Sequence, residues 1–199
     1  MKGFFDNLGF FASRFNQAIV ITIELSIISL IAATIIGIIV GLVNTSKSKS
    51  VIMKILKVIA NLYINIIRGT PMLVQILIIY FGLGQMLRPT GFRWLNIGGT
   101  FTAGTVALSL NAGAYMAEIV RGGIEAVDKG QIEAARSLGL TYGKTMKKIV
   151  LPQALRTMLP SIINQFIISI KDTSLLSVIG LTELTNVGKT IAATQSAHM

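Results

Sequence analysis

Few side chains in this sequence could carry out catalysis. The 199-residue chain has no cysteine and a single histidine, His198, close to its C-terminal end. Disulfides, thiolate metal sites and acid–base catalysis by an imidazole are therefore poor hypotheses. A membrane-embedded enzyme would also need paired carboxylates beside a usable His or Cys, and the sequence offers no such set. We predict no catalytic residue, no cofactor and no metal ligand.

The remaining candidates are polar side chains within an apolar stretch. Gln165, Lys171 and Asp172 interrupt such a stretch, and an ionisable group at the centre of a bilayer costs about 2.5 to 3.5 kcal/mol unless it faces a cavity or a partner. Gln165 and Asp172 are seven positions apart and share one helix face. Asp172 and Lys171 could match the ammonium and carboxylate of a free amino acid, with Gln165 meeting a polar side chain. Alternatively, Lys171 pairs with Asp172 or with Glu118 as a structural lock.

Four apolar stretches must position these side chains. Hydrophobic residues make up 52% of the chain and charged residues 13%, and the mean hydropathy is +0.71, values typical of a membrane protein. The first stretch is long enough for the ~30 Å hydrocarbon core, and the third is rich in Ala, Gly and Ser, which favours close packing inside a bundle. The predicted spans are Ile19–Val43, Met72–Leu87, Phe101–Val120 and Met158–Leu181.

The region between the first two spans predicts an amphipathic helix. One polar stripe is formed by residues at steps of three or four, namely Lys54, Lys57, Asn61, Asn65 and Arg68. Such a helix either lies in the membrane interface or turns this stripe toward partner protein. Proline at position 71 predicts a break near the sequence RGTP. After the second span, a Pro- and Gly-containing loop carries a tryptophan at position 94 that we expect at the membrane surface.

The positive charge of the chain follows from membrane topology. Residues 44–68 and 121–157 lie on one side if the four spans alternate, and they contain twelve of the 18 Lys and Arg residues. That side is the cytoplasm by the positive-inside rule, so the N-terminus lies outside. The net charge of +10 then needs no nucleic-acid partner, and no basic surface with interleaved aromatic residues argues for one.

The second cytoplasmic region predicts two short helices. The first carries Glu133 in its first turn, where a carboxylate suits the helix dipole, and ends near Gly139. The second begins near Thr141 and ends before Pro152. Glu118 and Arg121, one helical turn apart near the cytoplasmic end of the third span, are predicted to form a structural ion pair.

Residues 133–152 carry a specific resemblance. The sequence EAA is followed after three residues by Gly139 and after nine more by IVLP. This spacing resembles the EAA loop of permease subunits in ATP-binding-cassette importers. The segments RGTPMLVQ (68–75), NAGAYMAEIVRGGIEAV (111–127) and KDTSLLSVIGLTEL (171–184) are similar to the subfamily that imports polar amino acids.

The resemblance implies an all-α membrane bundle with the fold of type I importer permeases. Residues 1–199 would form a single transmembrane domain, and residues 129–155 a cytoplasmic coupling segment within it. Glu133, Ala134, Ala135 and Gly139 would contact a separate ATPase subunit. We place Gln165, Lys171, Asp172, Thr173, Ser174 and Asn111 along the substrate pathway.

The resemblance also implies partners and a location. These are ATPase subunits, an extracellular or periplasmic binding protein, a second permease copy or a paralogue, membrane lipid and a polar amino acid, all at a bacterial inner membrane. Family members usually have a further helix after the segment matching IAATQ, so the family's last span is expected to be missing here. The sequence VGKT (187–190) mimics the end of a P-loop, but position 183 is glutamate where that motif needs glycine.

Other functional classes remain as alternatives from the residues alone. A channel, a secondary carrier or a membrane scaffold would have similar apolar spans. None of them needs a segment for docking an ATPase, which favours the importer.

Overall fold

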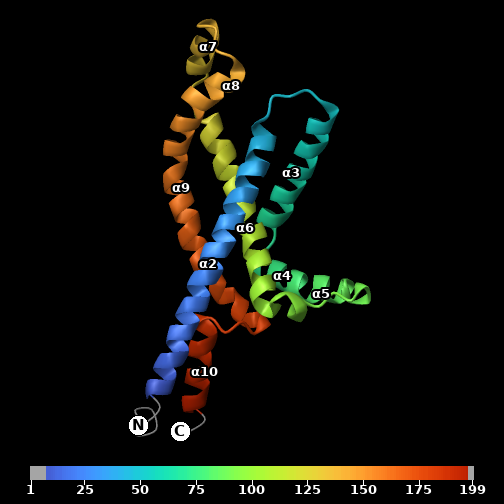
Figure 1. The fold of residues 1–199 in the computed structure, drawn as a ribbon, viewed down its shortest axis with the longest axis vertical. Helices are drawn as coiled ribbons and strands as arrows, with labels where there is room; N and C mark the ends of the chain where they lie inside the picture. Colours follow the sequence, from blue (N-terminus) through green and yellow to red (C-terminus); the bar gives the residue numbers. More distant parts are fainter. Residues whose placement is uncertain (1–7, 197–199) are drawn as a thin grey trace. The chain divides into compact units, whose positions relative to one another are not determined.

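The structure is a computed structural model that describes residues 8–196, and within that range it contains helices and no strand (Figure 1). The predicted all-α fold is confirmed. The longer helices are α2 (Leu8–Thr45), α3 (Val51–Gly69), α6 (Gly99–Glu125), α7 (Lys129–Ser137), α9 (Leu151–Asp172) and α10 (Leu184–Ser196). His198 lies outside the described residues.

The chain forms two compact units. One comprises the residues up to Ile31, Thr70–Ser109 and the residues from Ile168, and the other comprises Ala32–Gly69 and Leu110–Ile167. The first is built on an apolar cluster that includes Leu25, Leu108 and Leu176, and the second on a cluster that includes Val120, Val150 and Met158. The long helices α2, α6 and α9 contribute to both units.

Two described helical segments are long and apolar enough to cross a membrane, Phe11–Thr45 and Tyr142–Ile179. A third arises if α3 and Met72–Met86 are counted as one broken span. The 27-residue α6 is long enough to cross a membrane, but its mean hydropathy is lower than that of these segments. Its many Gly, Ser and Thr residues lower its hydropathy, and its burial explains why it tolerates them.

Helix α6 is buried in each of the two units, as its small residues predicted. Ala103, Ala107, Ala112, Ala114 and Ala117 are each at most 3% exposed. Where α6 meets α2, the contact positions on α2 are glycines, which have no side chain. A Cβ at Gly37 would collide with the Cβ of Met116, and a Cβ at Gly41 would lie 2.7 Å from that of Val120. Small residues at this spacing let the two backbones approach closely.

Helix α3 runs antiparallel to the second half of α2, to which the connection 46–50 joins it (Figure 1). Part of its polar stripe contacts the rest of the chain. Lys57 donates a hydrogen bond to the Ser46 carbonyl, and Asn61 accepts one from Asn44 at 3.0 Å. Ala60 and Ile64, on the same side of the helix, are buried.

The predicted break near RGTP is present, because α3 ends at Gly69 and the next helix starts after Pro71. The following helical region consists of α4 (Met72–Leu77), the π-helical turn η1 (Ile78–Leu83) and α5 (Gly84–Met86). Two short 3-10 helices, η2 (Arg88–Thr90) and η3 (Trp94–Ile97), lead to α6.

Trp94, which we expect at the membrane surface, is buried within the protein. This side chain is only 9% exposed. Its indole N–H donates to the carbonyl of Tyr80 at 3.0 Å, and its ring meets Phe92 edge to face. A buried tryptophan satisfies its one donor in this way, and the loop therefore folds back on the helix before it.

The predicted end of a helix before Pro152 is wrong. Helix α8 (Tyr142–Thr145), the π-helical turn η4 (Met146–Val150) and α9 follow one another without a break up to Asp172. Proline lacks an N–H and its ring clashes with the preceding turn of an α-helix. The wider π-turn lies directly before Pro152, where it rearranges the backbone pairing that proline disrupts.

Beyond α9 the chain continues as the 3-10 helix η5 (Thr173–Ile179), which ends at Gly180 with a φ of 80°. The fourth predicted span thus changes helix type after Asp172. Glu183 directly precedes α10. Its carboxylate, 1% exposed, accepts hydrogen bonds from the backbone N–H groups of Thr185 and Asn186 at 2.8 and 2.7 Å. Glu183, which stands where the P-loop motif needs glycine, therefore caps a helix.

The contact between α2 and α6 yields a stability prediction. Gly41→Ala should lower the free energy of unfolding by about 1–3 kcal/mol, because the added methyl group overpacks the contact with Val120. Unfolding of the purified protein in detergent, followed by circular dichroism, measures this change. The control is Gly122→Ala in α6, where an added Cβ has no neighbour within 4 Å. An unchanged stability of Gly41→Ala would mean that the helices do not meet at this point.

Candidate functional site

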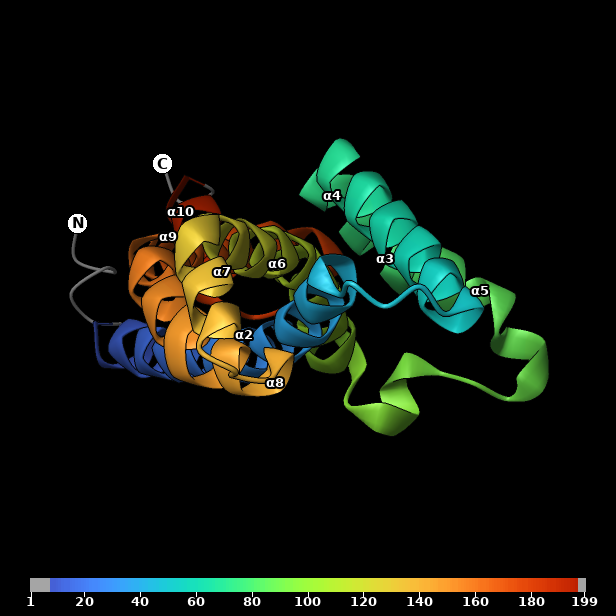
Figure 2. The same cartoon turned by 90° about the horizontal axis from the view of Figure 1, so that it is seen from above.

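Two features of the unit formed by Ala32–Gly69 and Leu110–Ile167 combine polar chemistry with accessibility. One is a cluster of charged side chains on α3 and α6 beside a cavity. The other is the segment from α7 to η4, which Figures 1 and 2 show beyond the ends of α6 and α9.

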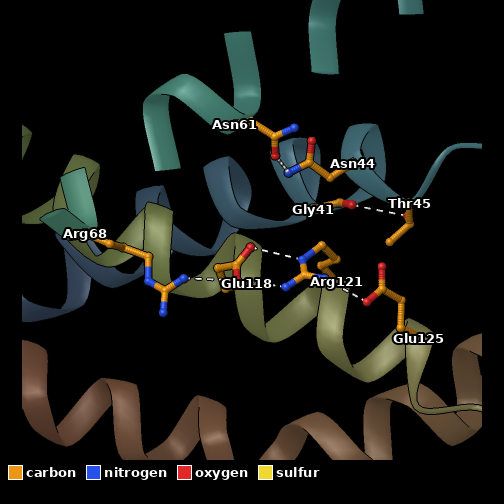
Figure 3. Close-up of polar contacts among 8 residues, drawn as sticks. All are labelled: Gly41, Asn44, Thr45, Asn61, Arg68, Glu118, Arg121 and Glu125. Carbon is orange, nitrogen blue, oxygen red and sulfur yellow. Dashed lines mark hydrogen bonds and ion pairs between the residues drawn. The ribbon is translucent and has the colours of Figure 1, made fainter. Parts of the chain in front are cut away.

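The charged cluster is centred on Glu118. Arg121 donates from Nε and Nη2 to the two carboxylate oxygens of Glu118, both at 3.0 Å, and this bidentate geometry is the strong form of an arginine–carboxylate pair (Figure 3). The second Nη of Arg121 reaches Glu125 at 2.7 Å. The predicted pair of Glu118 and Arg121 is therefore part of a larger network.

Arg68 completes that network, and the sequence did not single it out as a site residue. Its Nη1 lies 3.0 Å from Oε2 of Glu118, and its guanidinium lies 5.3 Å from the ring centroid of Tyr115. Arg68 is the last member of the polar stripe on α3, which is the signal that could have identified it. The cluster thus fixes the end of α3 to α6 through one carboxylate held by two arginines (Figure 3).

A cavity of about 350 Å³ adjoins this cluster. Arg68, Tyr115, Glu118 and Gln165 line it together with Ser161 and Thr157. Gln165 is 5% exposed and comes from α9, so three helices contribute to the lining. Asn111, also predicted on the pathway, is a buried residue of α6 at 6% exposure and does not line this cavity.

The other predicted pathway residues belong to the end of α9 and the start of η5. Lys171 is exposed, Asp172 and Ser174 are half-buried, and Thr173 is buried with its hydroxyl donating to the Ile170 carbonyl at 2.7 Å. In the described part of the chain, Lys171 and Asp172 form no ion pair, and the ionic partners of Glu118 are arginines.

Helix α7 differs from its predicted start. The oxygen of Asp128 accepts from the N–H of Gln131 at 3.3 Å, so Asp128 is the N-cap and α7 begins at Lys129. Glu133 consequently lies beyond the first turn rather than in it. The residue that suits the positive helix end is the acidic cap that precedes the EAA motif.

The predicted end of α7 at Gly139 is present and has a defined geometry. Gly139 has a φ of 82°. The N–H of Leu140 donates to the Ala135 carbonyl at 3.1 Å and that of Gly139 to the Arg136 carbonyl at 3.0 Å. These two bonds form a Schellman motif, which requires a left-handed residue at the position of Gly139.

This cap decides which side chains the segment presents. Glu133, Ala134 and Gly139 are exposed, whereas Ala135 is 3% exposed and packs inside the unit. Leu138, directly before the turn, is 83% exposed. The sequence did not single out Leu138, and its position before a helix-ending glycine is the signal that could have done so.

The fold and these features define a helical membrane protein with an exposed segment between α6 and α9. Comparison with known families gives the particular assignment. The chain belongs to the family described as "Binding-protein-dependent transport system inner membrane component", whose model matches residues 33–197. This finding confirms the importer family that the EAA motif indicated.

Two relatives share this assignment. The arginine transport system permease protein ArtQ of Bacillus subtilis (strain 168) is 42% identical over 165 residues, which are 83% of this chain and 70% of ArtQ. The glutamine transport system permease protein GlnP of Escherichia coli (strain K12) is 43% identical over 172 residues, 86% of this chain and 74% of GlnP. The protein is therefore a permease subunit of an ABC importer.

Solved structures support the same fold. An amino acid ABC transporter crystallised with histidines is 37% identical, with a TM-score of 0.82, and the match covers 96% of this chain and 83% of that one. The MetNI methionine ABC transporter in an inward-facing form has a TM-score of 0.70 at 20% identity, covering 88% of this chain and 79% of that one. At the latter identity the likeness extends to the fold alone.

The cap of α7 yields a second prediction. Gly139→Ala should weaken the local structure by about 1–2 kcal/mol because alanine disfavours the left-handed conformation. Amide hydrogen exchange should then be about tenfold faster at Leu140. Gly139→Asn should cost less, since asparagine tolerates this conformation, and Gly143→Ala is the control because that glycine is helical. Equal exchange rates in all variants would contradict the role assigned to Gly139.

Proposed function

We propose that this subunit forms the membrane pathway for a polar amino acid and that a separate ATPase, docked on α7, drives its opening and closing. The observation that carries the proposal is the exposed, rigidly capped segment at 133–140. ArtQ and GlnP, named for arginine and glutamine transport, support the substrate class. Residues 44–50 and the α7 segment would face the cytoplasm, with the N-terminus outside.

The contact with the ATPase is proposed on the exposed side of α7. Glu133, Ala134 and Leu138 would enter a groove of the partner, with Leu138 supplying the apolar anchor and Glu133 a charge. Ala135 contributes from the inside, because its carbonyl accepts the Schellman bond that ends the helix. Gly139 would act by allowing the turn that brings Leu138 outward.

The continuous helix from Tyr142 to Asp172 suits force transmission. A push on α7 passes through the compact cluster of Ile132, Met146 and Val150 into the start of that helix. Because the helix is not interrupted at Pro152, movement of its cytoplasmic end would tilt the membrane-spanning part with it. ATP-driven approach of two such segments, from two permease subunits, would switch the access of the pathway.

Binding of the external protein would shift the equilibrium between the inward- and outward-facing states toward the outward-facing one. A ligand shifts a conformational equilibrium only by its difference in affinity for the two states. A loaded binding protein that fits only the outward-facing state would favour it, and ATP hydrolysis in the partner would reset the cycle. The second permease is either another copy of this chain or a paralogue.

The ATPase contact yields a third prediction. Leu138→Asp should weaken association with the ATPase subunit about tenfold or more, because burial of a leucine side chain is worth about 1.5–3 kcal/mol. Co-purification and titration of the labelled ATPase subunit in detergent measure this loss. Glu133→Lys should reduce binding in the same assay.

A matched control uses another exposed leucine. Leu95 is 86% exposed, as Leu138 is 83% exposed, but it belongs to η3 and is predicted on the opposite side of the membrane. Leu95→Asp should leave ATPase association intact. Equal binding by Leu138→Asp and Leu95→Asp would refute docking on α7.

The substrate is proposed to pass the cavity beside Glu118. Its volume of about 350 Å³ lies at the small end of ligand cavities, which span about 300–1,000 Å³, and this suits a free amino acid. The ion pair of Arg68 and Glu118 would open when substrate binds. Arg68 would then bind the carboxylate of the amino acid, and Glu118 its ammonium group. Gln165 would meet a polar side chain, while Asn111, Lys171, Asp172, Thr173 and Ser174 continue the pathway.

The cavity yields a fourth prediction. Gln165→Ala should raise KM for uptake between about twofold and tenfold, the equivalent of one hydrogen bond at ~0.5–1.5 kcal/mol. The measurement is uptake of a labelled amino acid into vesicles containing the complete transporter, across a panel of amino acids. The neighbouring exposed residue provides the control, because Asn164→Ala should leave KM unchanged.

The same assay tests the end of α9. Asp172→Asn should also change uptake kinetics if its carboxylate meets the substrate's ammonium group. Wild-type kinetics in Asp172→Asn would remove this residue from the pathway, and a wild-type KM in Gln165→Ala would remove the cavity.

A further inference from the structure

A second, larger cavity of about 700 Å³ lies between α2, α3, the end of α6 and the α7 segment. All its lining residues belong to the unit of Ala32–Gly69 and Leu110–Ile167. It does not include Gln165 or the Glu118 pair, so the proposed substrate contacts leave it unexplained.

The cavity is positively charged. Lys47, Lys57 and Lys129 line it, and Glu125 is the one acidic residue of the lining. Glu125 is already paired with Arg121 at 2.7 Å. In the part of the chain that the structure describes, none of the three lysines forms an ion pair. An anion would therefore find three ammonium groups, of which that of Lys57 also donates to the Ser46 carbonyl, and no free carboxylate.

The rest of the lining is amphiphilic. Ile124, Val127, Ile132, Met146 and Val150 supply apolar walls. Asn44, Thr45, Ser46 and Tyr142 add amide and hydroxyl groups. An occupant with a phosphate, hydroxyl groups and an attached apolar part matches this lining. A small inorganic anion matches it less well, because it would make no apolar contact with the walls.

The position of the cavity agrees with a lipid. It begins where α2, the longest apolar helix, ends at Thr45, which is the predicted boundary between hydrocarbon and cytoplasm. Basic pockets between membrane helices at the cytoplasmic side suit the headgroups of anionic lipids.

We propose that this cavity binds the glycerophosphate headgroup of an anionic phospholipid, held by Lys47 and Lys57 on one side and Lys129 on the other. The lipid would bridge the connection between α2 and α3 to the segment on which the ATPase docks. An empty cavity leaves like charges facing one another. Bound anionic lipid would therefore stabilise the docking segment.

Binding is tested on the full chain in nanodiscs of phosphatidylcholine with and without phosphatidylglycerol. Phosphatidylglycerol should raise the unfolding temperature, and native mass spectrometry should detect the retained lipid. Replacing Lys47, Lys57 and Lys129 together with glutamine should abolish both effects. Affinity should fall about fivefold for each lysine removed, the equivalent of ~1 kcal/mol.

The matched control removes the same charge from the same side of the membrane. Lys49→Gln, Lys144→Gln and Lys148→Gln, combined in one chain, alter three exposed lysines outside the cavity lining and should keep the lipid effect. If both triple variants lose it equally, general surface charge explains the effect and the site is refuted. Single Lys57→Gln and Lys129→Gln variants replace the triple one if that chain fails to fold.

Two further arms decide the source of the phosphate and the nature of the occupant. Glycerol 3-phosphate or inorganic phosphate, added to phosphatidylcholine nanodiscs, should have little effect, and protection equal to that by phosphatidylglycerol would overturn the lipid. Loss of ATPase association in lipid-free detergent, caused by the cavity variant alone, would mean that the ATPase fills the cavity and would also overturn it.

This inference depends on the proposed function only for the side of the membrane on which the cavity lies. The binding arm contains no substrate and no ATPase. Its failure with intact amino acid uptake would refute the lipid site and leave the importer in place. Lipid binding by a chain that takes up no amino acid would support the lipid site and refute the importer.

Discussion

Close approach of α2 and α6 is the constraint on which the rest of the structure depends. Helices surrounded by lipid gain little from burying apolar side chains against each other, so their association relies on packing at short range. Gly37 and Gly41 permit that approach to Met116 and Val120. Glu118 lies between these two contact positions on α6. Glu118 uses another face of the same helix, on which it pairs with Arg68 of α3.

Local sequence predicted what depends on local chemistry. The small residues of α6, the break at Pro71, the ion pair of Glu118 and Arg121, and the turn at Gly139 all follow from neighbouring residue types. Each involves positions within one or two helical turns. The EAA spacing also predicted the family, because residues 133–152 resemble a motif that is specific to importer permeases.

Tertiary contacts determined the features that the sequence left open or led us to misplace. The sequence did not predict the burial of Trp94, whose indole N–H donates to the carbonyl of Tyr80. Pro152 suggested a helix end, but a π-turn accommodates it within a continuous helix. Arg68 belongs to a stripe whose partner on α6 is distant in sequence. The burial of Ala135 and the exposure of Leu138 depend on how α7 packs.

The low hydropathy of α6 bears on how the protein is made. A helix rich in Gly, Ser and Thr partitions weakly into a bilayer, because its polar groups gain nothing from hydrocarbon. During biosynthesis it would need α2 already in the membrane to offer a protein surface. Changes at Gly37 or Gly41 would then act first on insertion of the growing chain. Their earliest sign would be too little protein in the membrane, before any altered rate of transport.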